Sequence, residues 1–228
     1  VFIDDPLPSS ISQLGAASRV WLHHSLNDLN QSLQGLHNRL ILRQGAALEV
    51  LRALIQETGA TQLFWNRCYD PATVARDKTL KAQLSSVVSI QSFNGALLYE
   101  PWQTLKADGT PFKVFTAYWN HTLKKGIDHP LYQAPNTLTA PAVLPTSLSL
   151  DDLKLLPRIA WDHTIMQHWR TGEQAAHQAL QRFLAEAAQD YDHARNLPAL
   201  SATSSLSAYL HLGAISPRQV IHASLQWQ

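Results

Sequence analysis

The sequence predicts an α/β fold, in which a parallel sheet covered by helices is followed by a purely helical part. Two observations carry this prediction. Up to Phe93, short apolar runs with the character of strands alternate with amphipathic helical runs, and beyond it only helical periodicity recurs. A proline-rich stretch at 129–147 separates the two patterns. Strands that alternate with helices form parallel sheets with helices packed on their faces.

The chain begins with an apolar strand. Val1-Phe2-Ile3 is followed by Asp4-Asp5-Pro6, which is typical of the loop that leaves a strand. Because the chain begins inside this strand, we expect it to be a piece of a longer protein. Apolar residues at spacings of two to four then predict a helix over 18–36.

Two units of strand and helix follow, and then a last strand. Gly59 is expected to close a helix and Pro71 to open the next, because glycine adopts the left-handed helix end and proline suits the first turn. The expected strands lie at 39–43, 62–66 and 87–93, and the expected helices at 46–58 and 71–84. This order predicts a Rossmann-like parallel sheet, whose ligands would bind at the carboxyl ends of the strands. The dinucleotide pattern G-x-G-x-x-G is absent.

Composition limits the classes of function. Of the 228 residues, 45% are hydrophobic and 15% are charged, which suits one large or two small folded domains. The formal net charge of +1 gives no global basic signature, so a contact with nucleic acid has to come from a local patch. The single Cys68 excludes an internal disulfide, and no stretch resembles a membrane span or a signal peptide. We therefore expect a soluble, cytoplasmic protein.

The histidines form no metal-binding pattern. His163 and His168 are five residues apart, which does not place them on one helix face, and neither H-E-x-x-H nor C-x-x-C occurs. The G-x-S-x-G turn of serine hydrolases is also absent. We expect neither a metal site nor a hydrolase.

Helices dominate after the proline-rich stretch. Ser149 predicts the start of a short helix over 151–155, and a long helix is predicted over 175–190. The last part of the chain is then helical as well.

The stretch 202–220 contains two helix starts and one helix stop. The hydroxyls of residues 203–205 precede a short apolar helix and can cap it. Gly213 suits its end, and Ser216-Pro217 suits the start of another helix. The residues alone leave three interpretations open: a helical hairpin with ordinary caps, a helix-turn-helix that reads DNA, and an anion site at a helix N-terminus.

Residues 203–219, TSSLSAYLHLGAISPRQ, resemble the start of the flavin-binding domain of the DNA photolyase and cryptochrome family. That family carries a pattern close to T-S-x-L-S-x-Y-L-x-x-G-x-I-S-P-R, and nearly every fixed position is filled here. The resemblance implies that FAD is the cofactor and that one turn lines its diphosphate, namely Thr203, Ser204, Ser205, Leu206 and Ser207. Many relatives have Arg or Lys where this chain has Ser205, a departure that removes one positive charge near the phosphates or the DNA.

Motifs along the rest of the chain resemble the same family. Residues 64–71 resemble its F-W-N-R-x-Y-x-P element, and residues 169–173 its W-x-x-G-E. Residues 93–101 and 109–116 resemble its segment F-x-x-x-L-L-x-E-P … G-x-P-x-x-V-F-T. Each motif alone also has a local structural interpretation, and only their order is specific. The resemblance covers almost the whole chain and is greatest to class I cyclobutane pyrimidine dimer photolyases.

The resemblance also assigns roles outside this turn. Tyr191 matches a tyrosine that contacts FAD, and Arg195 matches a basic residue near a DNA phosphate, a contact that positions the duplex without reading its sequence. Members that bind a folate antenna chromophore often carry an Asn-Glu pair where this chain has Ala72-Thr73. We therefore expect an antenna chromophore, whose identity stays open, to be held in another way.

The resemblance implies an incomplete protein of two domains. We expect an α/β antenna domain over 1–128, a connector over 129–147 and the start of a helical FAD-binding domain over 148–228. The family's opening strand, with W-F-R-x-D-L-R, has no counterpart in this sequence, and the family's later helices would follow residue 228. The complete enzyme would use light absorbed by FAD to split a cyclobutane pyrimidine dimer in damaged DNA, and this chain alone should be inactive.

Two alternatives share some of these features. A cryptochrome-type blue-light receptor would carry every motif seen here. A non-flavin helix-turn-helix regulator would instead bind DNA through the last helices, although Gln219-Val220-Ile221-His222 is poorly basic for a recognition helix. For the complete photolyase the expected macromolecular partner is damaged DNA that contains a pyrimidine dimer, and we expect no membrane and no metal as a partner.

Overall fold

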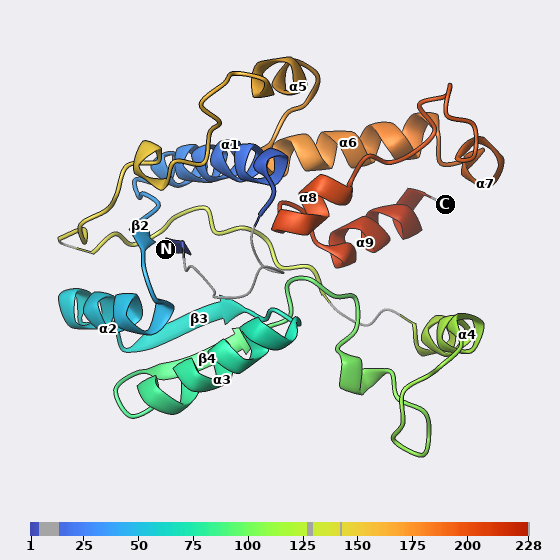
Figure 1. Cartoon of the computed structure of the whole chain (residues 1–228). Coiled ribbons are helices and arrows are strands. Elements are labelled where there is room, and N and C mark those ends of the chain that lie inside the picture. Colours follow the sequence, from blue (N-terminus) through green and yellow to red (C-terminus); the bar gives the residue numbers. More distant parts are fainter. Residues whose placement is uncertain (5–13, 127–129, 142, 228) are drawn as a thin grey trace.

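The computed structural model describes residues 1–4, 14–126, 130–141 and 143–227 (Figure 1). The strands are β1 (Phe2–Asp4), β2 (Leu42–Gln44), β3 (Gln62–Asn66) and β4 (Ser89–Phe93). The helices are α1 (Ala16–Gln34), α2 (Ala47–Thr58), α3 (Pro71–Leu84), α4 (Phe115–Lys125), α5 (Asp162–His168), α6 (Gly172–Glu186), α7 (Tyr191–Ala194), α8 (Ser207–Leu212) and α9 (Pro217–Trp227). The exit loop predicted at Asp5-Pro6 lies outside the described residues, as do positions 129 and 142 of the predicted connector.

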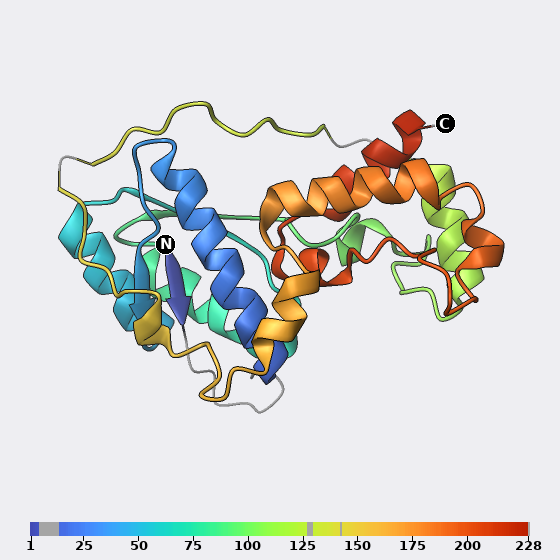
Figure 2. The same ribbon diagram turned by 90° about the horizontal axis from the view of Figure 1, so that it is seen from above.

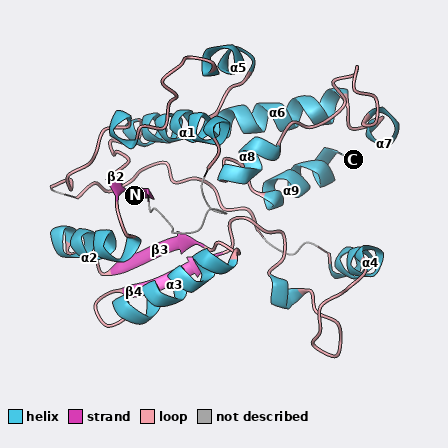
Figure 3. Cartoon of the chain, in the orientation of Figure 1, coloured by secondary structure: helices cyan, strands magenta, loops and turns pink. Residues whose placement is uncertain are grey.

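The strands form two parallel pairs, which Figure 3 shows in magenta. In one pair Phe2 lies opposite Leu42, and in the other Gln62 lies opposite Ser89. Within the described residues β1 bonds only to β2 and β3 only to β4, so one edge of β1 and one edge of β3 have no strand partner. The predicted α/β class and the parallel direction are confirmed. The single continuous sheet that the alternation predicts is not present, because no ladder joins the two pairs.

A side-chain cap fixes the start of α3, and a buried leucine at its other end packs the helix beside β3 and β4. The Asp70 carboxylate caps this helix by accepting a hydrogen bond from the Thr73 N–H at 3.0 Å, and Pro71 occupies the first turn, as predicted. At its other end Leu84 is completely buried against α2 and the strands. Gly59 ends α2 with a φ of 64°, the left-handed conformation expected of glycine there.

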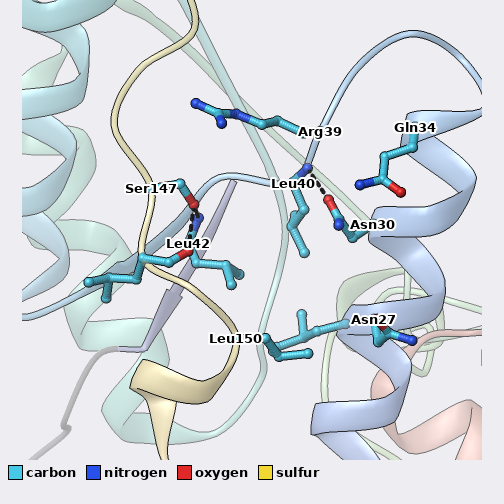
Figure 4. Close-up of a pocket in the computed structure, with 10 residues that line it drawn as sticks. Asn27, Asn30, Gln34, Arg39, Leu40, Leu42, Ser147 and Leu150 are labelled. Carbon is cyan, nitrogen blue, oxygen red and sulfur yellow. Dashed lines mark hydrogen bonds between the residues drawn. The ribbon is translucent and has the colours of Figure 1, made fainter.

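The edge of β2 is covered by the connector. Of the strand predicted at 39–43, only the part from Leu42 onward belongs to β2, and the Ile41 carbonyl just before it accepts a hydrogen bond from the Phe2 N–H of β1 at 2.8 Å. Ser147 Oγ accepts a hydrogen bond from the Leu42 N–H at 2.9 Å, and Asn30 Oδ1 of α1 accepts one from the Leu40 N–H at 2.9 Å. Both contacts lie at the rim of a cavity of about 310 Å³ between α1, β2 and the connector (Figure 4). The connector is therefore fixed to the α/β part by specific hydrogen bonds.

The helices after the connector form a second lobe, which Figure 2 shows beside the α/β part. Its core is made by α6, α8 and the turn before α9, and consists of Ala176, Ala179, Leu180, Leu184, Leu206, Tyr209 and Ile215. Ser216 caps α9 as predicted, because the Gln219 N–H donates to its Oγ at 3.2 Å. Within the described residues, no helix has the length and hydrophobicity needed to span a membrane.

Three helical features differ from the predictions. The sequence patterns predict neither α4 nor α5, and no side chain caps the start of either helix. Aromatic and β-branched residues give α4 low intrinsic propensity, so its tertiary contacts decide its structure. The helix predicted over 175–190 starts earlier and ends at Glu186, because the N–H groups of Ala187 and Ala188 both turn back to the Phe183 carbonyl.

Candidate functional site

The turn before α8 carries the residues to which the family resemblance assigns the diphosphate. Thr203, Ser205 and Ser207 are exposed and Ser204 is half-buried. Ser205 has a φ of 54°, the left-handed conformation that is uncommon for a residue other than glycine. Such backbone outliers cluster at binding sites, where the surrounding structure holds them in place.

The hydroxyls of this turn do not cap α8, which corrects the prediction from the sequence. The N-cap position is Leu206, one residue later than the predicted caps, and no side chain bonds the first turn. Within the described residues, the hydroxyls of Thr203, Ser204, Ser205 and Ser207 make no hydrogen bond, and the backbone N–H groups of 204–207 have no acceptor. The turn therefore presents a row of free donors at a helix start, which is the arrangement that binds anions.

Buried neighbours hold the turn in place. Leu206 is 3% exposed within the core of the second lobe, so only its backbone can reach a ligand. Tyr209, in the first turns of α8, donates its hydroxyl to the Arg170 carbonyl at 2.7 Å. Burial raises the pKa of the Tyr209 hydroxyl, which keeps it protonated as a donor. The buried side chains of Leu206 and Tyr209 consequently hold the donors of the turn in a fixed arrangement.

Tyr191 and Arg195 form a second small cluster on α7. The Tyr191 ring meets Phe183 edge to face, with ring centroids 5.5 Å apart. The Arg195 guanidinium lies 5.5 Å from the centre of the Tyr191 ring and 3.8 Å from the Asp192 carboxylate, with both charged side chains largely exposed. Within the described residues, no hydrogen bond or ring contact joins this cluster to the turn at 203–207.

The contact between the two lobes, which we call the joint, is made by Trp21 and Asp28 of α1 with Trp169, Thr171 and Tyr209 of the helical lobe. The sequence analysis predicted no role for these side chains. Trp21 of α1 packs edge to face on Trp169 and on Tyr209, at centroid distances of 5.4 and 5.2 Å. The Thr171 hydroxyl donates to the Asp28 carboxylate of α1. The W-x-x-G-E motif signals this joint, because it supplies both Trp169 and the glycine that begins α6.

That glycine, Gly172, is required by its surroundings. Its φ is +87°, and a Cβ atom built on it would lie 3.0 Å from the Asp28 Cβ. Beside this contact lies a cavity of about 980 Å³, lined by α1, the start of α6, the turn between α8 and α9, and residues of β1 and β3. Asn66, the last residue of β3, lines it, so the cavity reaches the carboxyl end of a strand.

An ion pair with a buried carboxylate connects two of the sequence motifs. Glu100 is 5% exposed and accepts hydrogen bonds from the Arg67 guanidinium and, at 2.9 Å, from the Tyr69 hydroxyl. Arg67 also donates to the Ser92 carbonyl at 2.6 Å. Burial and the Glu100 carboxylate raise the pKa of Tyr69. The F-W-N-R-x-Y and L-L-x-E-P motifs are thus two halves of one hydrogen-bonded network at the carboxyl ends of β3 and β4.

Thr73 sits in the first turn of α3, at the position where folate-binding relatives often have glutamate. Its hydroxyl donates to the Asp70 backbone carbonyl at 3.1 Å and to the Asp70 carboxylate, and hydrogen bonds from Thr73 lower the pKa of Asp70. The Thr73 side chain is buried and its hydroxyl is used by the cap. The expectation that no Asn-Glu pair holds an antenna chromophore here stays a prediction.

An α/β part and a helical lobe that carries a turn of free donors define a two-lobed protein suited to an anionic ligand. The DNA photolyase family model matches residues 1–138. The chain belongs to the DNA photolyase family, as the motifs predict.

Individual relatives agree with this family and span both of its branches. A deoxyribodipyrimidine photo-lyase of Agrobacterium fabrum is 41% identical over 217 residues, which are 94% of this chain and 45% of that protein. Cryptochrome-2 of Arabidopsis thaliana is 33% identical over 231 residues, 98% of this chain and 38% of that protein. The chain therefore spans about half the length, or less, of these curated relatives.

Solved structures give the same result. A bacterial class III photolyase from Agrobacterium tumefaciens has a TM-score of 0.89 at 41% identity, over 97% of this chain and 46% of that chain. A Synechocystis cryptochrome has a TM-score of 0.83 at 22% identity, which supports the fold alone. The solved structure from Agrobacterium tumefaciens is named a class III photolyase, whereas the motifs resemble class I photolyases most.

Proposed function

We propose that the complete protein is a photolyase that repairs cyclobutane pyrimidine dimers in DNA with light and FAD. The observation that carries the proposal is the turn at 203–207. Its residues match the family's flavin motif, and the same residues present a row of free hydrogen-bond donors. The 41% identity to a deoxyribodipyrimidine photo-lyase supports it.

Each group of this chain has a defined task in the proposal. When bound, FAD supplies the light-driven electron transfer that splits the dimer. The hydroxyls of Thr203, Ser204, Ser205 and Ser207 and the adjoining N–H groups hold its diphosphate, as they suit two phosphate groups in number and chemistry. Tyr191 packs against the flavin side of the site, and Arg195 contacts a phosphate of the DNA.

Residue Ser207 gives the sharpest test of the flavin site. In the complete protein, Ser207→Ala should lose one hydrogen bond to an anionic group and weaken FAD binding by roughly 1.5–3 kcal/mol. Ser86→Ala, at an exposed position in the α/β part, is the matched control and should keep full flavin content. Flavin content measured by absorbance after gel filtration decides the matter, and equal content in the two variants would contradict the proposed role.

A cryptochrome-type receptor is the second candidate, and the 33% identity to Cryptochrome-2 over 98% of the chain favours it. Both candidates need the flavin site, so only the reaction separates them. The complete protein, loaded with reduced FAD and illuminated on DNA that contains a pyrimidine dimer, should restore the bases if it is a photolyase. Flavin binding without repair would support the receptor. Sequence-specific duplex binding without flavin would instead support the helix-turn-helix regulator.

We also propose that this chain alone is inactive, since it spans only about half of the relatives' length. The turn at 203–207 is exposed on one side, and a flavin site has to enclose the adenine and the ring system as well.

A further inference from the structure

One face of α4 carries large apolar side chains that contact nothing on their outer side. Phe115, Trp119 and Leu123 are 73%, 47% and 59% exposed. They are spaced four residues apart, which places them on one face of the helix. The Phe115 and Trp119 rings are stacked nearly parallel, with centroids 6.2 Å apart and an angle of 13°, so the two aromatic side chains adjoin on this face.

The neighbouring face of α4 is fixed to the rest of the α/β part. The Tyr99 hydroxyl donates to the carbonyls of Thr122 and Gly126, at 3.3 and 2.7 Å. The Tyr118 ring packs on Phe112 at a centroid distance of 6.3 Å. Because these contacts set the rotation of the helix, the apolar face cannot turn inward without breaking them. Its exposure is a property of the fold and calls for a partner.

We propose that this face of α4, made by Phe115, Trp119 and Leu123, is the docking surface for the C-terminal half of the complete protein. Two observations select this occupant. The curated relatives are at least about twice as long as the chain. In Figures 1 and 2, α9 ends on the same side of the molecule as α4, so a continuing chain would start from that side.

The chemistry of the end of α9 agrees with this occupant. Leu225 and Trp227, in its last turns, are 56% and 46% exposed, so further apolar surface lies at the point where the chain would continue. The face of α4 itself carries no charge, and its basic residues Lys124 and Lys125 lie at the helix end. We expect the docking segment to be a helix with aliphatic or aromatic residues on one face. The inference does not rest on photolyase activity.

Thiol labelling of the complete protein tests the inference. In a background in which Cys68 and every cysteine of the remaining chain are replaced by serine, Phe115→Cys places a thiol on the proposed surface and Ala117→Cys places one at an exposed position of the same helix. The thiol at 115 should react about tenfold or more slowly than the thiol at 117, because a covered thiol reacts only when local structure opens. Leu123→Cys repeats the test at a second position if Phe115→Cys does not fold.

Equal labelling rates at the proposed surface and at position 117 would overturn the inference. Slow labelling that becomes fast when the protein is diluted would also overturn it, since a second copy of the chain would then be the occupant. Slow labelling at positions 115 and 123 that is independent of protein concentration is the expected result. Because labelling does not involve flavin or DNA, it can succeed even if the proposed repair reaction is absent.

Discussion

At the scale of single residues, Glu100 shows how a motif that looks like a simple turn becomes a structural anchor. Its carboxylate is buried and receives Arg67 and Tyr69. Glu100→Ala would remove the acceptor that Arg67 and Tyr69 share, while Arg67 keeps its hydrogen bonds to Ser92, and should lower the free energy of unfolding by about 1–3 kcal/mol. Glu49→Ala is the control, because Glu49 pairs with Arg52 on the surface and should cost at most about 0.5 kcal/mol. Urea unfolding of both variants measures the difference, and similar losses would contradict the role assigned to Glu100.

Arg195 allows the DNA contact to be tested separately. Its side chain is about half exposed, and among the described residues its guanidinium contacts the Tyr191 ring and the Asp192 carboxylate alone, so it is available to a phosphate. In the complete protein, Arg195→Ala should weaken binding to damaged and undamaged duplex by a similar factor and reduce the slope of log affinity against log salt by about one. Binding measured across a salt series checks this.

Two other binding results for Arg195→Ala would contradict the predicted phosphate contact. A loss confined to damaged DNA would place the residue in the lesion pocket. No loss with either DNA would leave it as a helix-end residue paired with Asp192.

At the scale of elements, the joint between the lobes depends on Gly172. Gly172→Ala should cost roughly 2–4 kcal/mol, because the new Cβ combines a disfavoured positive φ with displacement of Asp28 from Thr171. Gly59→Ala is the matched control: its φ is +64° but no atom lies within 4 Å of a new Cβ, so it should cost only about 1 kcal/mol. Equal shifts of the unfolding midpoint would mean that the contact with Asp28 contributes nothing.

The elements that the sequence predicts well are those with local chemistry at their ends. Asp70-Pro71 fixes the start of α3 and Gly59 the end of α2, since capping and left-handed glycine act within a few residues. Helix α4 has no such signal and is held by Tyr99, a residue distant in sequence. The capping of α8 failed as a prediction because three hydroxyls in a row cannot show which one the backbone will use.

The candidate site was predictable only through the order of its residues. Residues 203–207 match a family pattern, yet nothing in their chemistry alone shows that their donors stay free or that Leu206 is buried. The joint formed by Trp21, Trp169 and Tyr209 brings three distant segments together, and one sequence gives no sign of such contacts.

At the scale of the whole molecule, the isolated chain should bind FAD weakly. The turn at 203–207 supplies donors for the diphosphate, but an exposed turn cannot exclude water from a flavin ring system. Titration of the isolated 228-residue chain should give an affinity weaker than micromolar, and the flavin should separate from it during gel filtration. Retention of yellow flavin through the column would show that the site is already complete within this chain.

Two of the strand edges that lack a strand partner within the described residues, those of β1 and β3, have a consequence for how the isolated chain behaves at high concentration. The free edges of β1 and β3 present rows of N–H and C=O groups, and neither strand contains a lysine or proline that would block pairing with another chain. Each edge can act as a template for a strand of a neighbouring molecule. Solutions of the isolated chain should therefore aggregate through intermolecular β-structure, faster as the concentration rises, well before the helical lobe unfolds.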